Sequence, residues 1–250
     1  MKVEWDYTHL AQAYLKRPDY APEVIDAIIA RAGVTSGSRV CDVGAGVAHM
    51  TLPLLARGLT VDAVEPNDAM RALGIERTDA NPTVAWYEGT GEATGMPTAA
   101  YALVTFGSSF NVCDRAAALR ETARILAPGG WFACLWNHRD LDDPLQAEVE
   151  ALIRGRVPDY ALGTRREDQT AVIRASGLFG PVEALEGQIV HTVPAQHWVE
   201  AWRSHATLAR QAGGEHPAVV AAIEDLLKAR GLDAVPVPYT TRAWVARRQD

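Results

Sequence analysis

The stretch VCDVGAGVAH places an acid and two glycines at the end of a short apolar run, Arg39–Val43. Asp42 lies two positions before Gly44, and Gly46 follows, so the backbone can approach a ligand with no side chain in the way. A dinucleotide-binding turn has a further small residue three positions after its second glycine, where this chain has His49. The lysine of a phosphate-binding P-loop is absent from the stretch. The turn therefore predicts a nucleotide-like ligand without a tightly packed pyrophosphate.

A second acid, Glu65, ends the next β-rich run, Thr60–Val64, in the stretch VDAVEPND. In a βαβ unit, the acid that closes the second strand faces the ribose of a bound nucleoside, and a carboxylate can accept both ribose hydroxyls. Nicotinamide-dependent dehydrogenases share this feature. The glycine turn and Glu65 together indicate a nucleoside cofactor, and they leave its identity open.

Both features require a parallel sheet, and the chain alternates between β-rich runs and helical stretches. The expected strands are Arg39–Val43, Thr60–Val64, Thr83–Tyr87, Leu103–Phe106, Trp131–Trp136, Val182–Val193 and Ala234–Arg247. The expected helices are Val24–Ala32, His49–Ala56, Asp68–Ile75, Arg115–Leu126, Pro144–Arg154, Asp168–Ala175, Gln196–Arg210 and Ala218–Arg230. Single helices between strands predict right-handed crossovers. We expect an α/β fold with a Rossmann-like, doubly wound, mostly parallel seven-stranded sheet and helical insertions that form a lid.

We expect one domain over residues 1–250, because no linker rich in glycine, serine or proline divides the chain. Residues 1–36 would form an N-terminal helical lid and residues 37–136 the cofactor-binding core. Residues 137–250 would supply substrate-side insertions and the last two strands. About 40 residues separate those two strands, with Trp198 and Trp202 four positions apart on one helix. Such insertions predict a roof over a pocket for a small acceptor.

Composition and charge exclude some classes of binding partner. The net charge is −7, and an acidic surface argues against binding to a nucleic-acid backbone. The polar N-terminus is not a secretory signal, and no apolar run approaches the length of a membrane span. Cys41, Cys113 and Cys134 are widely spaced in apolar surroundings, which predicts buried reduced thiols and no metal site. We expect a cytoplasmic protein with a small-molecule or short-peptide acceptor, no nucleic acid and no membrane.

Five stretches resemble the class I S-adenosylmethionine-dependent methyltransferases, and among them the small-molecule group called the methyltransferase 11 type. They are VCDVGAGVAH, VEPNDAM, YEGTGEATGMP, LVTFGSSFNVCD and ETARILAPGGWFACLW, in the family's order from Val40 to Trp136. The resemblance implies the fold expected above. It also implies S-adenosyl-L-methionine as the cofactor and transfer of its methyl group to an acceptor.

Roles follow from the resemblance at the first two strand tips. Gly44, Ala45 and Gly46 would pass the methionine part of the cofactor, and Glu65 would hold the ribose. Asp42, at the end of the first strand, would orient the amides of the turn or the cofactor's ammonium group. These positions would form the floor of the cofactor site.

The adenine would lie further along the same edge. Met70 would pack on its ring, and Thr90, Gly91 and Glu92 match the stretch that lines its rim. The chain departs from the family here, since Thr90 stands where an aspartate is common. The contact to the adenine amino group would therefore pass to Glu92 or to the backbone.

The resemblance also assigns the two remaining sides of the cofactor. Phe106 to Ser109 would follow the fourth strand beside the sulfonium. Tyr14 and Arg17, in the lead-in segment, would close over the cofactor, with Arg17 on the methionine carboxylate.

Methyl transfer needs alignment and exclusion of water, because the donor sulfonium is already activated. The fourth and fifth strand tips would flank the methyl group, and they carry Phe110, Asn111, Trp136, Asn137 and His138. Asn111 and His138 are the catalytic candidates, the first as a hydrogen-bond acceptor for the acceptor's amine or hydroxyl and the second as a base. We expect N-methylation of a bacterial secondary metabolite, as in antibiotic biosynthesis, or of a small peptide. O- or C-methylation is the alternative.

Two other classes of protein compete with this hypothesis. A nicotinamide-dependent reductase would share Glu65, but the chain has neither the third small residue nor a Y-x-x-x-K pair. A non-catalytic subunit would bind the same cofactor and methylate nothing.

Overall fold

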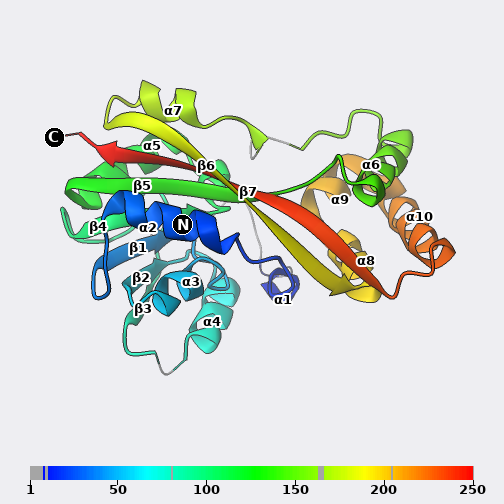
Figure 1. Ribbon diagram of the computed structural model, residues 1–250, viewed down its shortest axis with the longest axis horizontal. Helices are drawn as coiled ribbons and strands as arrows, with labels where there is room; N and C mark the ends of the chain where they lie inside the picture. The colour runs from blue at the N-terminus through cyan, green and yellow to red at the C-terminus, as the bar shows by residue number, and fades with distance from the viewer. Residues whose placement is uncertain (1–7, 9–10, 80, 163–165, 204, 250) are drawn as a thin grey trace.

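The computed structural model describes residues 8, 11–79, 81–162, 166–203 and 205–249, so residues 1–7 and 9–10 of the expected N-terminal lid lie outside the described part. At its centre is a seven-stranded sheet with the order β3-β2-β1-β4-β5-β7-β6 (Figure 1). Its strands are β1 Arg39–Val43, β2 Thr60–Val64, β3 Val84–Tyr87, β4 Tyr101–Gly107, β5 Leu126–Arg139, β6 Phe179–Pro194 and β7 Ala234–Arg248. Only β7 runs antiparallel to its neighbours. The predicted mostly parallel α/β sheet is confirmed.

The helices are α1 Ala11–Tyr14, α2 Pro22–Ala32, α3 Thr51–Ala56, α4 Asp68–Arg77, α5 Arg115–Ile125, α6 Pro144–Arg156, α7 Thr170–Ala175, α8 Ala195–Arg203, α9 Ala206–Ala212 and α10 His216–Ala229. Side-chain caps set several of their starts: the Asn67 amide oxygen accepts from the Met70 N–H at 3.0 Å, and Asp114 accepts from the Ala117 N–H at 3.0 Å. Local sequence therefore fixes where these helices begin.

Most expected helices shift by one or two residues at an end, and two of the differences have a clear physical reason. The helix expected from His49 begins at Thr51, so Pro53 lies in its first turn, where a missing N–H leaves no bond unmade. The helix expected over Gln196–Arg210 is divided into α8 and α9. His205 caps the second of them, since its Nδ1 accepts from the Leu208 N–H at 3.1 Å.

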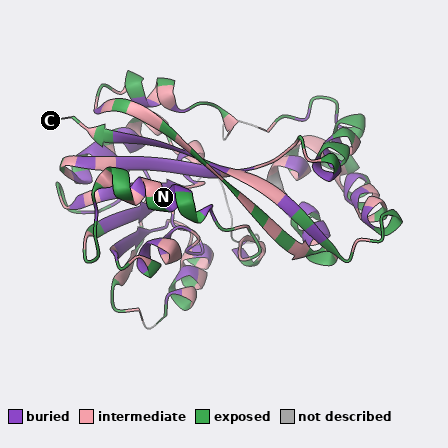
Figure 2. Cartoon of the chain, viewed as in Figure 1, coloured by how far each residue is buried: buried purple, intermediate pink, exposed green. Residues whose placement is uncertain are grey.

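Helices cover both faces of the sheet, as a doubly wound fold requires. On one face, Ile25 and Ile28 of α2 pack against Leu103 and Leu135 of the strands. On the other face, α5 and α7 cover a cluster centred on Phe106 and its neighbouring aromatic rings. Figure 2 shows the inner strands almost continuously buried, whereas β6 alternates between half-buried and exposed residues at the sheet edge.

The insertions form a second packed body beside the sheet. Strands β6 and β7 continue beyond the sheet as a long ribbon, and α8, α9 and α10 connect their far ends (Figure 1). Helix α6 joins them around a separate hydrophobic core that includes Val149, Trp198, Val219 and Val237. The insertions thus stand beside the carboxyl ends of the parallel strands, where an α/β sheet binds its ligands.

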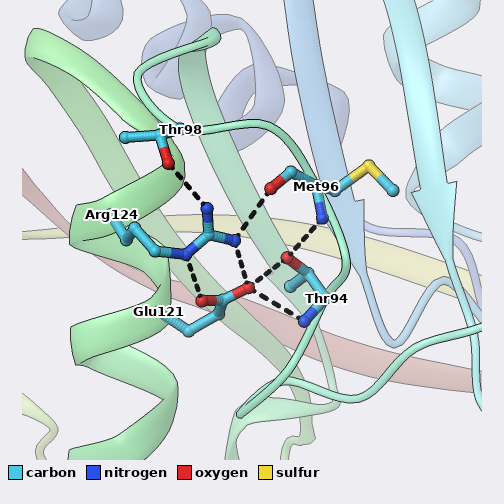
Figure 3. A network of polar contacts seen from close by, with 5 residues as sticks. All are labelled: Thr94, Met96, Thr98, Glu121 and Arg124. Atoms are coloured by element: carbon cyan, nitrogen blue, oxygen red, sulfur yellow. Dashed lines mark hydrogen bonds and ion pairs between the residues drawn. The ribbon is translucent and has the colours of Figure 1, made fainter.

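A polar network fixes the loop that follows β3 (Figure 3). The Glu121 carboxylate on α5 accepts from the Thr94 N–H at 2.9 Å and from the Arg124 guanidinium at 2.7 Å. Arg124 donates in turn to the Met96 carbonyl at 2.8 Å and to the Thr98 hydroxyl at 2.9 Å. Residues 90–92 belong to this loop, so α5 holds the predicted adenine rim in place.

Candidate active site

A cavity of about 870 Å³ lies between the carboxyl ends of the strands and the insertions. Its walls come from the tips of β1, β2, β4 and β5, the segment around α1, and the far parts of β6, β7 and α8. The volume is at the upper end of small-molecule sites, which span about 300–1,000 Å³. One cavity therefore has room for a nucleoside cofactor and a second small molecule.

Two left-handed glycines shape the turn after β1, with φ of 67° at Gly44 and 56° at Gly46. A Cβ at Gly44 would lie 2.4 Å from the Cβ of Ser109, whose hydroxyl donates to the Val43 carbonyl at 2.6 Å. A Cβ added at Gly46 would have a backbone oxygen, 4.0 Å away, as its nearest neighbour. The clearance predicted for the cofactor tail therefore applies at Gly46, whereas at Gly44 Ser109 fills the space.

We expect Gly44→Ala to lower the free energy of unfolding by about 1–2 kcal/mol more than Gly33→Ala, because both variants strain a left-handed backbone and only Gly44→Ala adds a clash. Gly33 ends α2 with φ of 63° and has no other atom within 4 Å of the added Cβ, which makes it a matched control. Urea unfolding of the two variants measures the difference. Equal losses would show that Ser109 yields without cost.

Glu65 closes β2 and is buried, with 7% of its surface exposed. Its Oε2 accepts from the Gly46 N–H at 2.8 Å, and its Oε1 accepts from the Asn67 N–H at 2.9 Å. Burial raises the pKa of this carboxyl, and the two N–H bonds offset part of the increase. Each oxygen has a further lone pair, so Glu65 can both hold the glycine turn and accept ligand hydroxyls.

Asp42 is fully buried at the tip of β1 but still contributes to the cavity wall. Its Oδ2 accepts from the Thr51 hydroxyl at 2.7 Å and its Oδ1 from the Thr105 hydroxyl at 2.9 Å. Burial raises its pKa to about 6, although both hydroxyls stabilise the charge. The carboxylate thus joins α3 and β4 to β1 directly behind the turn.

The predicted adenine rim lies on the same side of the cavity. Met70 is buried against Ala11 and Val47 and lines the cavity. The Thr90 hydroxyl lining this wall is buried and has no hydrogen-bond partner among the described residues. Glu92 accepts from the Asp114 N–H at 2.7 Å, which holds the loop against the start of α5. An orphaned buried hydroxyl fits a ligand that supplies a polar atom there.

The segment around α1 closes one side of the cavity. The Arg17 guanidinium lies 3.9 Å from the centre of the Tyr14 ring, and both side chains line the cavity. His49 donates through Nε2 to the Tyr14 carbonyl at 2.7 Å. Asn137 on β5 donates to the Asp19 carbonyl at 2.8 Å. His49 therefore has a structural role, and the core holds this segment in place at two points.

Several residues predicted near the fourth strand tip lie outside the cavity. Phe106 is fully buried among Phe110 and Phe132, with ring centroids at 5.5 and 5.7 Å. Asn111, in the short 3-10 helix η2 Phe110–Val112, accepts from the Trp136 indole N–H at 2.9 Å. The expectations that Phe106 flanks the sulfonium and that Asn111 contacts the acceptor are corrected: Phe106 packs in the core with Phe110 and Trp136, Asn111 is bonded to the Trp136 indole, and neither lines the cavity.

The prediction that His138 faces the acceptor as a base is corrected for a related reason. Side chains alternate along a strand, so Asn137 and Arg139 of β5 face the cavity while His138 points to the opposite face. It is buried, with 5% of its surface exposed. The expected strand ended at Trp136, whereas β5 continues to Arg139 and carries the side-chain alternation that turns His138 away from the cavity.

The structure adds residues that the sequence did not indicate. Tyr20 lines the cavity, and its hydroxyl lies 2.9 Å from that of Ser108, which has a φ of 59°. Burial raises the pKa of the Tyr20 phenol well above its ordinary value. Arg139 and His191 line the far end, next to Trp202 of the predicted roof. These three residues come from distant parts of the chain, so no local pattern connects them.

Cys41 and Cys134 are buried and unpaired in the core, whereas Cys113 is half-buried in the cavity wall. Within the described ranges, no group of three or more histidine, cysteine, aspartate or glutamate side chains is placed to hold a metal ion. The helices in this part of the chain are all too short or too polar to cross a membrane.

A doubly wound sheet with a glycine turn and a buried acid at the tip of β2 is the arrangement typical of nucleoside-binding α/β proteins. Residues 41–134 match the family model described as a methyltransferase domain. An uncharacterized methyltransferase of Mycobacterium tuberculosis is 38% identical over 124 residues, covering 50% of this chain and 48% of that protein.

A ubiquinone/menaquinone biosynthesis C-methyltransferase of Caulobacter vibrioides is 34% identical over 140 residues, covering 50% of this chain and 54% of that protein. The chain spans about half the length of the curated relatives it matches. The family-model match ends at residue 134, before α6 and the other insertions begin.

Solved structures share the fold over nearly the whole chain. A protein assigned as a type II methyltransferase, from Anaeromyxobacter dehalogenans, superposes with a TM-score of 0.66 at 20% identity, covering 92% of this chain and 97% of that one. Phosphoethanolamine N-methyltransferase 2 of Haemonchus contortus, in complex with phosphomonomethylethanolamine and S-adenosylhomocysteine, gives 0.55 at 16% identity, covering 96% and 57%. The expected Rossmann-like, doubly wound fold is thus confirmed.

Proposed function

We propose that this protein is an enzyme that transfers the methyl group of S-adenosyl-L-methionine to a small organic acceptor. The observation that carries the proposal is the buried Glu65 carboxylate, which lies in the cavity wall and is bonded to the N–H of Gly46. This is the placement a ribose diol requires, since each carboxylate oxygen can accept a further hydrogen bond. The match of residues 41–134 to a methyltransferase domain supports a sulfonium nucleoside over a dinucleotide.

The residues along the cavity fit that cofactor from end to end. The open space at Gly46 suits the methionine chain, and Arg17 can pair with its carboxylate. Met70 offers an apolar surface for the adenine, and the orphaned Thr90 hydroxyl offers it a polar contact. Thr90 can thus take over the contact for which an aspartate is common in the family.

When bound, S-adenosylmethionine supplies a methyl carbon that bonds to the acceptor as its bond to sulfur breaks, the electron pair staying on sulfur. The chain's own contribution is to align the reactants and to exclude water. Tyr14, Arg17 and Tyr20 form a wall across the strand tips, tethered through Asn137 and His49. Tyr20 and Ser108 lie where this wall meets the end of β4.

We keep an amine as the first acceptor group, because a neutral amine needs no base and Asn111 and His138 lie away from the cavity. C-methylation is the second candidate, and the C-methyltransferase relative from Caulobacter vibrioides supports it. The setting is proposed as well: methylation of a small molecule in the cytoplasm, as in secondary metabolism or antibiotic biosynthesis.

Calorimetric titration with S-adenosylhomocysteine and with NADH tests the cofactor, and isotope-labelled S-adenosylmethionine with a panel of amines and phenols tests the reaction. We expect micromolar S-adenosylhomocysteine binding, no NADH binding, and label in at least one acceptor. Tight NADH binding without a response to the methyl donor would instead indicate a reductase. Cofactor binding with no acceptor labelled would indicate a non-catalytic subunit.

A further inference from the structure

The acids that line the cavity all lie at one end of it. They are Asp42, Glu65, Glu92 and Asp114, at the cofactor end, on the tips of β1 and β2 and the loops after β3 and β4. We call the opposite end, lined from the tip of β5, the far parts of β6 and β7, α8 and the segments that flank them, the acceptor end. Its arginine and histidine lining residues are Arg139, Arg166, His191, His197 and His205, with no acid among the lining residues that the structure describes. This end therefore favours a negatively charged group.

Arg139 is the buried cation of the acceptor end, with 11% of its side chain exposed. Its guanidinium donates to Gln146 Oε1 at 3.0 Å and to Glu150 Oε2 at 3.1 Å. The same Glu150 carboxylate also accepts from Arg154 at 3.2 Å, so one negative charge serves two guanidinium groups. An arginine has five N–H donors, and these contacts occupy two of them. The two guanidinium groups therefore keep a net positive charge beside Glu150, and Arg139 keeps N–H donors that a ligand can use.

Aromatic side chains surround this cation. The Arg139 guanidinium lies 4.9 Å from the centre of the Trp202 ring, and Trp198 meets Trp202 edge to face at 5.9 Å. Tyr160 and Tyr239 complete the lining. These rings give the acceptor end walls suited to a flat aromatic body, for which stacked and edge-to-face contacts are favourable.

The Trp202 indole N–H, at this end of the cavity, has no hydrogen-bond partner in the described part of the chain. This N–H is buried, and the residue is 5% exposed. Indole nitrogen can only donate, so a buried indole N–H without an acceptor carries a desolvation cost. His191 Nε2 is likewise buried without a hydrogen-bond partner. A ligand that supplies acceptor oxygens would remove the cost at Trp202.

We propose that the acceptor is a small aromatic acid, whose carboxylate is held by Arg139 and the Trp202 N–H and whose ring lies among the aromatic side chains of the acceptor end. This inference rests on the proposed methyl transfer and names its substrate class. The atom that receives the methyl group is then an amine, hydroxyl or ring carbon on the same molecule, directed toward the cofactor end.

Matched acid and amide pairs test the proposal. We would titrate 2-aminobenzoate against 2-aminobenzamide, and 4-hydroxybenzoate against 4-hydroxybenzamide, with and without bound S-adenosylhomocysteine. Each pair differs only in the charged group, so we expect the acid to bind at least about tenfold more tightly. We also expect labelled methyl transfer to an acid of the panel and none, or far less, to its amide.

Two substitutions test whether Arg139 and the Trp202 N–H cause the preference for the acid over the amide. Trp202→Phe keeps an aromatic ring and removes the N–H, and should reduce the acid preference by about three- to tenfold. Arg139→Gln should abolish the preference. Arg203→Gln, on the exposed side of α8 and paired with Glu224 at 2.9 Å, is the matched control and should leave it intact. If Arg139→Gln fails to fold, Trp202→Phe alone decides.

The outcomes separate the two proposals. Equal binding of acids and amides, or an acid preference that is unchanged in Trp202→Phe, would overturn the aromatic-acid inference even if the donor and some acceptor react. Absence of S-adenosylhomocysteine binding would overturn the methyl-transfer proposal. In that case the titrations without cofactor still decide whether the acceptor end selects a carboxylate.

Discussion

Replacing Glu65 with alanine is expected to weaken S-adenosylhomocysteine binding by at least about tenfold, because a charge-assisted contact to ligand hydroxyls contributes roughly 1.5–3 kcal/mol. The structure adds a second cause. Glu65 also accepts from the N–H groups of Gly46 and Asn67, so the substitution releases the glycine turn from the tip of β2. Loss of the direct contact and loss of the turn's geometry act in the same direction.

Isothermal titration of the wild type, Glu65→Ala and Glu65→Gln would measure the effect. Glutamine keeps one acceptor oxygen, so its affinity should fall between the other two. Glu88→Ala, which removes an exposed acid further along the chain from Glu65, is the control and should bind as the wild type does. An unchanged affinity in a folded Glu65→Ala protein would remove Glu65 from the cofactor site.

Asp42→Asn is expected to stabilise the protein above pH 6 by up to about 3 kcal/mol. The folded-state pKa of Asp42 is about 6 because the group is buried, whereas its ordinary value is 3.8. Below the ordinary value the carboxyl is protonated in both the folded and the unfolded state and has no effect. As pH rises to about 6, the unfolded state ionises first, so the free energy of unfolding falls, by about 1.4 kcal/mol per pH unit of pKa difference.

Asparagine has no charge to bury and can still meet both hydroxyls, accepting from one of Thr51 and Thr105 and donating to the other. Urea unfolding at pH 4 to 8 should therefore show an advantage of the variant that grows up to pH 6 and then stays level. Asp225→Asn, at an exposed position of α10, is the control and should track the wild type at every pH. A difference that does not change with pH would contradict a buried, charge-penalised Asp42.

Much of the cofactor side of this molecule can be predicted from short segments of its sequence. The bounds of β1 and β2 match the prediction residue for residue, because a short apolar run closed by a turn or an acid has few other interpretations. The glycine turn and Glu65 are adjacent to those strands in sequence, so a parallel pairing of β1 with β2 is enough to bring them together. The resemblance over residues 40–136 covers the same local segments, and every predicted cofactor residue except Phe106 lines the cavity.

Which side chains line the acceptor end of the cavity could not be predicted from any short segment of the sequence. Whether His138 or Arg139 faces the cavity is decided by how far β5 extends and by its pairing with β7, and a shift of one residue reverses the side of the sheet. Gly44 makes room for Ser109, a residue distant in sequence that only the folded chain brings beside it.

The sequence by itself therefore determined the parallel sheet, the glycine turn after β1 and the match of residues 41–134 to a methyltransferase domain, since each depends on residues that are close along the chain. The tertiary structure alone decided what surrounds the acceptor. Arg139, Trp202 and His191 meet there because β5 ends alongside the ribbon of β6 and β7 and α8 packs against that ribbon, and this arrangement is set by packing between distant segments.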